Sequence, residues 1–331
     1  MATSKLPGEF DLIARYFAPL AANAAGALGL KDDAFTFQPP AGTELVLTAD
    51  ALTAGIHFLR SDPPDLVARK MLRVNLSDLA GKGARPLGYL MTVAFDDGID
   101  ESWVAKFVEG LAQDQAEFGI ALWGGDTTAT PGPLALTATL IGSVPAGRAL
   151  RRRGAGPGDR ILVSGTIGDG FFGLAAHRGE LADLAEPARR FLAQRYLVPQ
   201  PRAALGRVLA EQGLAHAGMD VSDGLAADLR HMCEASGCAA RVEVAKIPVS
   251  DAVAEMLANS PPLIASALTG GDDYELLLSV PPDRVDAVSD AAEKAGTRVT
   301  DIGVFTAGLA VDFIDRDGAP LALEKPGFTH F

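Results

Sequence analysis

The pattern of apolar and polar positions predicts helices and strands in alternation along the chain. In the first half, alternating and β-branched apolar residues predict strands at 44–50, 87–95 and 134–144. Apolar residues at helical spacing predict helices at 65–82 and 101–119. Near the start, a helical stripe predicts an amphipathic helix whose apolar face carries Phe10, Ile13, Phe17 and Leu20.

The second half follows a segment rich in glycine, arginine and proline at 147–160, which we interpret as the passage between two domains. Its predicted helices are 171–178, 185–196, 202–212 and about 224–236. Its predicted strands are 159–165, 239–247, 274–280, 298–305 and 309–315. Neither half has the strict βαβ rhythm of a parallel sheet. We therefore predict an α+β protein with two lobes, at 1–150 and 151–331.

Charge and composition narrow the class of protein. The net charge of −13 argues against electrostatic binding to nucleic acid or anionic membranes, although bound divalent cations could still admit a phosphorylated ligand. Two cysteines make no disulfide framework, and five scattered histidines form no zinc motif. The first residues have no apolar stretch typical of a signal peptide, and no segment has the length of a membrane span. We expect a cytoplasmic protein.

Aspartates recur where a predicted strand or a glycine-rich turn ends. They are Asp32, Asp33, Asp50, Asp78, Asp126, Asp220, Asp223, Asp272 and Asp273. Each one alone is an ordinary turn or helix-cap residue. If several converge, repulsion and desolvation would be prohibitive without cations between them, and Mg²⁺ with phosphate is the commonest arrangement of oxygen ligands.

The segment "MDVSDGLAADL" at 219–229 separates its aspartates by role. We expect Ser222 or Asp223 to cap the helix that follows, and Asp228, inside that helix, to be solvated. Glycines before Asp126 are expected to let the backbone approach a ligand closely. No phosphate-binding GxxxxGK[ST] loop or protein-kinase motif set occurs, and "GTIGDG" lacks the dinucleotide-binding spacing.

Taken in order, these segments resemble the thiamine-monophosphate kinase family of the aminoimidazole-ribonucleotide-synthetase-like superfamily. The resemblance is carried by "GEFDLIARYF", "GIHFLRSDPPDLVARKMLRVNLSDLAGKGARPLGYL", "GGDTT", "GRAL", "GDRILVSGTIGD", "MDVSDGLAADL", "GGDDYEL" and "GFTHF". It implies an N-terminal lobe with a mixed or antiparallel sheet that dimerises and binds ATP and magnesium. It also implies a C-terminal α+β lobe that completes the nucleotide and substrate site.

The resemblance further implies ATP-dependent phosphorylation of thiamine monophosphate to thiamine diphosphate by a magnesium-dependent homodimeric phosphotransferase. The implied metal ligands are Asp33, Thr48, Ala49, Asp50, Asp78, Asp126, Asp220 and Asp223, with only a backbone contact possible at Ala49. The implied ATP contacts are Gly125, Asp126, Arg148 and Ser222. The implied substrate contacts are His57, Asp272 and Phe328, and the implied catalytic residues are Asp126, Asp223 and Arg148.

Elementary chemistry agrees with these roles. The acceptor phosphate has a second pKa near 6, so near pH 7 it needs no general base. The task is to neutralise two anions, which magnesium and Arg148 would do. Departures from the family pattern are Lys31, Ala49, Ala129, Asp272 and Phe328. Alternatives are another ATP-using enzyme of the superfamily (an amidine-forming synthetase or a maturation-type protein), a non-catalytic nucleotide or metal sensor, and a scaffolding protein.

Overall fold

The computed structural model describes residues 6–323 and 327 and divides into two compact units. The N-terminal unit comprises Met1–Leu79 and Arg85–Ser143, and the C-terminal unit comprises Ala80–Ala84 and Val144–Phe331. Each unit has its own sheet, so the chain is an α+β protein as predicted. Among the described helices, none has the length and apolar character needed to cross a bilayer.

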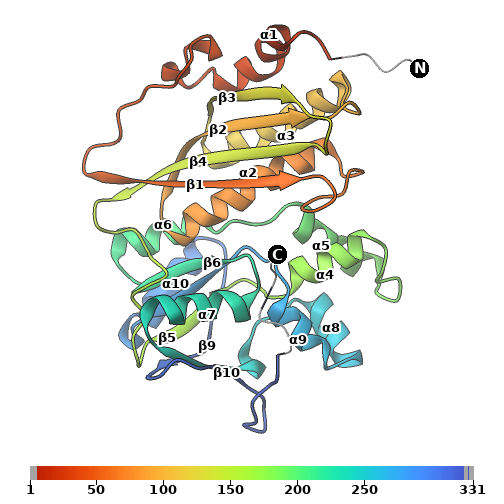
Figure 1. Ribbon diagram of the computed structural model, residues 1–331. Coiled ribbons are helices and arrows are strands. Elements are labelled where there is room, and N and C mark those ends of the chain that lie inside the picture. The colour runs from red at the N-terminus through yellow and green to blue at the C-terminus, as the bar shows by residue number, and fades with distance from the viewer. Residues whose placement is uncertain (1–5, 324–326, 328–331) are drawn as a thin grey trace. The chain divides into compact units, whose positions relative to one another are not determined.

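The N-terminal unit is built on a four-stranded sheet in the order β1-β4-β2-β3. Its strands are β1 (Thr43–Thr53), β2 (Arg85–Phe95), β3 (Leu122–Ala129) and β4 (Ala135–Pro145). Strand β2 runs antiparallel to β4 and parallel to β3, which makes the sheet mixed. Helices α2 (Pro64–Gly81) and α3 (Glu101–Phe118) lie behind this sheet in Figure 1.

Local sequence fixes both ends of α3. The Asp100 carboxylate accepts a hydrogen bond from the Trp103 N–H at 2.9 Å, which caps the helix start. Gly119 ends the helix in the left-handed conformation, with φ 66°. Buried Val104, Phe107 and Leu111 form the apolar stripe between these ends.

The expected amphipathic helix near the start is broken into short pieces. Helix α1 (Glu9–Leu12) passes into a π-helical turn at Ile13–Phe17 and then into a 3₁₀ turn at Ala18–Ala21. Phe17 and Leu20 are buried, but Phe10 is 83% exposed, so the prediction that it shares their apolar face is wrong. The change of helical pitch at Ile13–Phe17 rotates the stripe away from Phe10.

The C-terminal unit is built on a six-stranded sheet in the order β10-β7-β9-β5-β8-β6. Its strands are β5 (Arg160–Ser164), β6 (Ala217–Val221), β7 (Ala239–Glu243), β8 (Glu275–Val280), β9 (Val299–Thr306) and β10 (Val311–Ile314). Its helices are α4 (Asp169–His177), α5 (Glu186–Leu197), α6 (Ala203–Gln212), α7 (Leu225–Ser236), α8 (Asp251–Asn259), α9 (Leu263–Thr269) and α10 (Val285–Lys294). Among these six described strands, only β10 and β7 pair in parallel.

Helix α7 packs along β6, β7, β8 and β10 and supplies the centre of this unit's core. Leu225, Leu229 and Met232 of α7 are completely buried there. A second apolar cluster joins α4, α5, α8 and α9, which lie together in Figure 1. The turn after β6 and the turn before β8 therefore rest on a rigid base, because both adjoin the main core.

Candidate functional site

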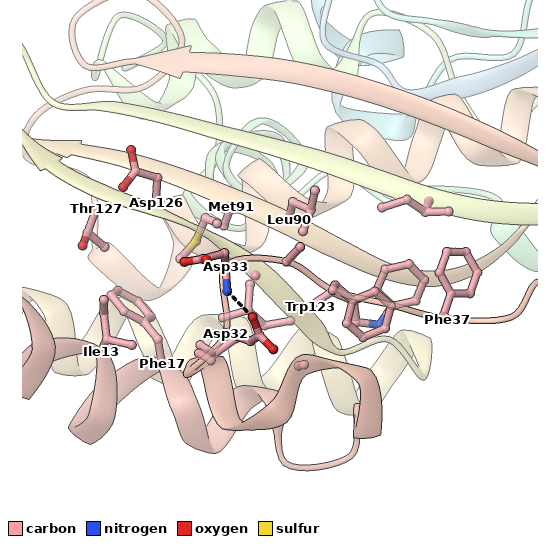
Figure 2. A pocket seen from close by; sticks show the side chains of 18 residues that line it. Ile13, Phe17, Asp32, Asp33, Phe37, Leu90, Met91, Trp123, Asp126 and Thr127 are labelled. Carbon is pink, nitrogen blue, oxygen red and sulfur yellow. Dashed lines mark hydrogen bonds between the residues drawn. The ribbon is translucent and has the colours of Figure 1, made fainter.

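A cavity of about 520 Å³ opens in the N-terminal unit (Figure 2). Its apolar end is formed by three aromatic rings. Phe35 stacks on Trp123 with a centroid separation of 4.3 Å and an interplanar angle of 11°, and Phe37 lies 4.7 Å from Trp123. Ile13 and Phe17 from the N-terminal turns line the opposite side of the cavity, near Asp126 and Thr127. The aromatic end can accept a flat, apolar or heteroaromatic group.

The other end of the cavity carries carboxylates and glycine. Asp126 lies at this end in Figure 2 and Asp33 lies between it and the aromatic rings; Gly125, next to Asp126 in the chain, also lines the cavity. Both carboxylates are exposed to solvent. Three residues of the predicted site thus share one cavity, beside an aromatic wall that the sequence analysis did not foresee.

Gly125 is required by the sheet itself. Its φ is 152°, and a Cβ atom there would lie 1.7 Å from the Met91 carbonyl oxygen on β2. Only glycine fits this close approach between strands. The close approach places Asp126 opposite Thr92 in the β2–β3 register. Asp126 consequently lies within a strand, not in a turn after one.

A second group of predicted ligands lies between β1 and α2. The Thr48 hydroxyl donates to a carboxylate oxygen of Asp78, and the Asp50 N–H donates to the Asn75 side chain at 3.1 Å. These two hydrogen bonds hold the end of the "ELVLTAD" strand against the "NLSDLA" segment of α2. Ala49 between them is exposed and has no side-chain oxygen. His57 follows the same strand, where its Nδ1 accepts the Thr53 N–H at 3.0 Å.

The turn after β6 presents the predicted ligands of the C-terminal unit. Asp220 is 6% exposed at the end of the strand, and Ser222 and Asp223 in the turn are half-buried. Neither caps α7, because the cap position is Gly224 and no side chain binds there. The expectation that Ser222 or Asp223 caps the helix is wrong.

The prediction that Asp228 is solvated is also wrong. Its side chain is 1% exposed, and it accepts the backbone N–H groups of Ser222 at 3.0 Å and Asp223 at 3.1 Å. Burial, together with the charges of Asp220 and Asp223, raises the pKa of Asp228 to about 7. The helical spacing predicts the buried apolar face of α7, but it does not predict that the Asp228 carboxylate beside that face is buried as well.

The loop before β8 is tied to the same turn. The Asp272 N–H donates to the Ser222 carbonyl at 2.9 Å, and the Tyr274 N–H donates to the Val221 carbonyl at 2.8 Å. Asp272 and Tyr274 both have positive φ, 72° and 52°. Asp tolerates this conformation better than most side chains, which is a local reason for aspartate at 272.

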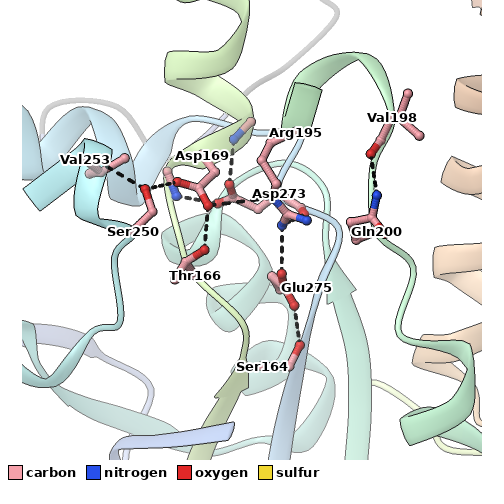
Figure 3. Close-up of polar contacts among 12 residues, drawn as sticks. Ser164, Thr166, Asp169, Arg195, Val198, Gln200, Ser250, Val253, Asp273 and Glu275 are labelled. Atoms are coloured by element: carbon pink, nitrogen blue, oxygen red, sulfur yellow. Dashed lines mark hydrogen bonds and ion pairs between the residues drawn. The ribbon is translucent and has the colours of Figure 1, made fainter. Parts of the chain in front are cut away.

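A buried polar network supports this loop from beneath (Figure 3). The Asp273 carboxylate accepts the N–H groups of Gly168 at 2.8 Å and Gly170 at 3.0 Å, and burial raises its pKa well above the ordinary value. Glu275 accepts from Arg195, Arg202 and Ser164. The network holds the chain rigid on either side of Tyr274, so Asp272 projects from a fixed support.

Two predicted residues remain. Arg148 is exposed, and its guanidinium lies beside Gly213, where an added Cβ would come within 2.6 Å of Nη1. Phe328 lies outside the described residues. Gly327 is described and packs against Ala227, with the Asp223 carbonyl nearby.

The predicted metal ligands suit a hard cation by their chemistry. Apart from Ala49 they offer only carboxylate or hydroxyl oxygens, the donors that Mg²⁺ prefers. The Thr48–Asp78 contact already brings two of them together. Within residues 6–323 and 327, no three His, Cys, Asp or Glu side chains are grouped closely enough to hold a metal ion.

Comparison with known proteins assigns both halves of the chain to one protein family. The model of the AIR synthase related protein N-terminal domain matches residues 31–144, and that of the C-terminal domain matches 156–315. The chain is 44% identical over 329 residues to the thiamine-monophosphate kinase of Caulobacter vibrioides, covering 98% of this chain and 91% of that protein. The chain therefore belongs to the thiamine-monophosphate kinase family.

Solved structures agree with this assignment. The thiamine-monophosphate kinase from Stenotrophomonas maltophilia K279a matches with a TM-score of 0.82 and 39% identity, covering 93% of this chain and 98% of that one. AaThiL complexed with AMPPCP and TMP matches with a TM-score of 0.77 and 30% identity over the full length of both chains. The fold predicted from the resemblance is confirmed.

Proposed function

We propose that this protein transfers the γ-phosphoryl group of ATP to thiamine monophosphate, forming thiamine diphosphate and ADP, the last step of thiamine diphosphate biosynthesis. The observation that carries the proposal is the family membership, which spans 98% of the chain. The complex of AaThiL with TMP and AMPPCP, a non-hydrolysable ATP analogue, supports the same pair of substrates. The acidic and aromatic cavity of the N-terminal unit supports the proposal, because it can accept a metal–nucleotide complex.

The cavity suits a nucleotide from end to end. Phe37, which is 39% exposed and packs against the buried Trp123, offers ring surface for the adenine base. Asp33 and Asp126, which line the same cavity, would bind Mg²⁺ carried on the phosphates. Aspartates alone would repel ATP, so this arrangement makes sense for a metal–nucleotide complex.

We assign magnesium to eight positions: Asp33, Thr48, Ala49 through its backbone, Asp50, Asp78, Asp126, Asp220 and Asp223. When bound, the metal ions would neutralise phosphate charge and orient the transferred group. Gly125 and Ser222 would contact ATP, and His57, Asp272 and Phe328 would contact thiamine monophosphate. Arg148 would balance charge on the transferring phosphoryl group, as Asp126 and Asp223 fix the metal.

The chemical step needs little proton movement. A phosphate oxygen of the acceptor attacks the γ-phosphorus as the bond to ADP breaks. Near pH 7 the acceptor phosphate is largely a dianion, because its second pKa is near 6. The residues of this chain thus act by binding, orientation and charge compensation, with no side chain required as a general base.

We also propose that the protein is a homodimer formed through the N-terminal sheet. Leu45 and Leu47 on edge strand β1 are 36% and 62% exposed. An exposed apolar edge of this kind usually pairs or is covered. The domain roles follow: 1–150 for ATP, magnesium and dimerisation, and 151–331 for completing the site. A cytoplasmic location fits the two free, buried cysteines.

Steady-state assays with ATP, MgCl₂ and thiamine monophosphate test the proposal. We expect equimolar thiamine diphosphate and ADP, separated by anion-exchange chromatography and measured by thiochrome fluorescence and absorbance. ADP formation with a different acceptor only, such as a formamide or a carbamoyl compound, would assign the chain to another branch of the superfamily. ATP binding without any product would identify a non-catalytic sensor.

A further inference from the structure

Asp228 stands out among the charged residues of the C-terminal unit. It lies in the first turn of α7, only 1% exposed, one helical turn after the segment that carries Asp220, Ser222 and Asp223. A buried carboxylate is costly unless it is well hydrogen-bonded, and placing it beside other carboxylates adds repulsion. The free-energy cost of burying this carboxylate must therefore be offset by interactions that it makes in the folded protein.

The hydrogen bonds of Asp228 show what it holds. A single oxygen, Oδ2, accepts the N–H groups of both Ser222 and Asp223, at 3.0 and 3.1 Å. Without an acceptor inside the protein, these two N–H groups would be left to bind water or an anion at the turn. Because Asp228 accepts both, the turn can contact a ligand through the side chains of Ser222 and Asp223 rather than through these amides.

The opposite side of the turn is fixed as well. The Ser222 carbonyl accepts the Asp272 N–H at 2.9 Å, and a Cβ at Gly271 would lie 2.4 Å from that carbonyl. Gly224, which follows the turn with φ 107°, packs against Gly270 with equally little space. The Asp228 side chain therefore fixes the N–H side of a turn whose C=O side is fixed by backbone.

We propose that Asp228 is a positioning residue that sets the orientation of Ser222 and Asp223 for binding the metal–nucleotide complex. The proposal rests on the proposed function for the identity of the ligand. Asp228 acts through its two hydrogen bonds, not as a ligand. A neutral side chain of the same shape should therefore serve, whereas a side chain without an acceptor should not.

Three variants separate these roles. Asp228→Asn keeps an acceptor oxygen of the same reach, and Asp228→Ala removes it. Asp159→Ala is the matched control, because Asp159 is 7% exposed and accepts the Gly156 N–H and the Ser279 hydroxyl. It lies at the other end of β6, since Ser279 pairs with Ala217 whereas Glu275 pairs with Val221.

The first measurement is hydrogen–deuterium exchange of the metal-free protein, resolved to the amides of Ser222 and Asp223. We expect faster exchange at both amides in Asp228→Ala and near-wild-type exchange in Asp228→Asn and Asp159→Ala. Unchanged protection in Asp228→Ala would overturn the proposal. Should Asp228→Ala yield no folded protein, Asp228→Ser replaces it, because its hydroxyl is too short to reach both amides.

The second measurement is Mn²⁺ binding in the presence of AMPPCP, followed by electron paramagnetic resonance. We expect the Mn²⁺ dissociation constant to rise about tenfold in Asp228→Ala, equivalent to 1.4 kcal/mol, and less than about threefold in Asp228→Asn. An equal rise in Asp159→Ala, or a rise in Asp228→Asn as large as in Asp228→Ala, would contradict positioning by hydrogen bonds. If wild type binds no Mn²⁺ and forms no product, the proposed function fails, while the exchange data still decide the role of Asp228.

Discussion

Glu275 is the residue whose neutralisation we expect to destabilise the C-terminal unit most. Its side chain is completely buried and accepts from Arg195 Nη2 at 2.8 Å and Ser164 Oγ at 2.6 Å (Figure 3), and also from Arg202 Nε at 2.7 Å. Glu275→Gln keeps the shape but removes the charge that balances two guanidinium groups. It also places an N–H₂ group where a donor already points.

The cost follows from the burial of the partners. Removing one member of a buried ion pair costs about 3–5 kcal/mol, since the remaining charge stays desolvated. The Arg195 and Arg202 side chains are 10% and 21% exposed, so water can solvate them in part and the lower figure applies. About 3 kcal/mol corresponds to a fall in Tm of roughly 6–12 °C for a unit of this size.

Thermal and urea unfolding at pH 7.5, followed by circular dichroism, measure this change. Glu211→Gln is the matched control, because Glu211 forms an exposed pair with Arg207 in the same unit, with 3.8 Å between Oε1 and Nε. We expect the control to change the free energy of unfolding by less than about 0.5 kcal/mol. A Tm for Glu275→Gln within 2 °C of the control would refute the argument that the buried network carries this stability.

Two further predictions concern the N-terminal unit. Asp126→Asn should lower kcat by about 10²–10³-fold without changing Tm, because it removes a metal-binding charge worth several kcal/mol of transition-state stabilisation. The control is Asp97→Asn, which neutralises an exposed charge in the turn after β2 and should leave kcat unchanged. Asp96→Asn should reduce the free energy of unfolding by about 1–3 kcal/mol at pH 7. The Arg60 guanidinium lowers the pKa of Asp96, so its stabilisation is present above the ordinary value of 3.8 and is lost as the pH falls through the lower folded-state pKa. Urea unfolding at pH 7 and pH 3 should show that difference shrink, and a constant difference would contradict the ion-pair account.

Strong periodicity made most elements predictable. The predicted helices at 65–82 and 101–119 correspond to α2 and α3, and the predicted strand at 87–95 lies within β2. Strand β3 was missed, because "LWGGDTTA" has glycines and polar residues where a strand normally has β-branched ones. The register with β2 outweighs that local preference, since Gly125 alone fits against the Met91 carbonyl. Helices α8, α9 and α10 also escaped prediction, being short and flanked by proline or glycine.

The candidate site was predictable in its residue types but not in its geometry. Oxygen ligands and the missing phosphate-loop motifs pointed to magnesium and phosphate chemistry. The aromatic wall of Trp123, Phe35 and Phe37 could not be foreseen, because its rings come from a turn and a strand far apart in the sequence. Asp228 was misjudged because helical position alone does not show that two unsatisfied N–H groups lie within its reach.

Metal-dependent phosphoryl transfer to thiamine monophosphate is the activity that we propose for this chain. The most direct test supplies [γ-³²P]ATP, thiamine monophosphate and MgCl₂, and follows the label. We predict label in thiamine diphosphate in a one-to-one ratio with ADP, abolished by EDTA and reduced at least a hundredfold in Asp126→Asn. Label released only as inorganic phosphate, or equal transfer by wild type and Asp126→Asn, would contradict the account.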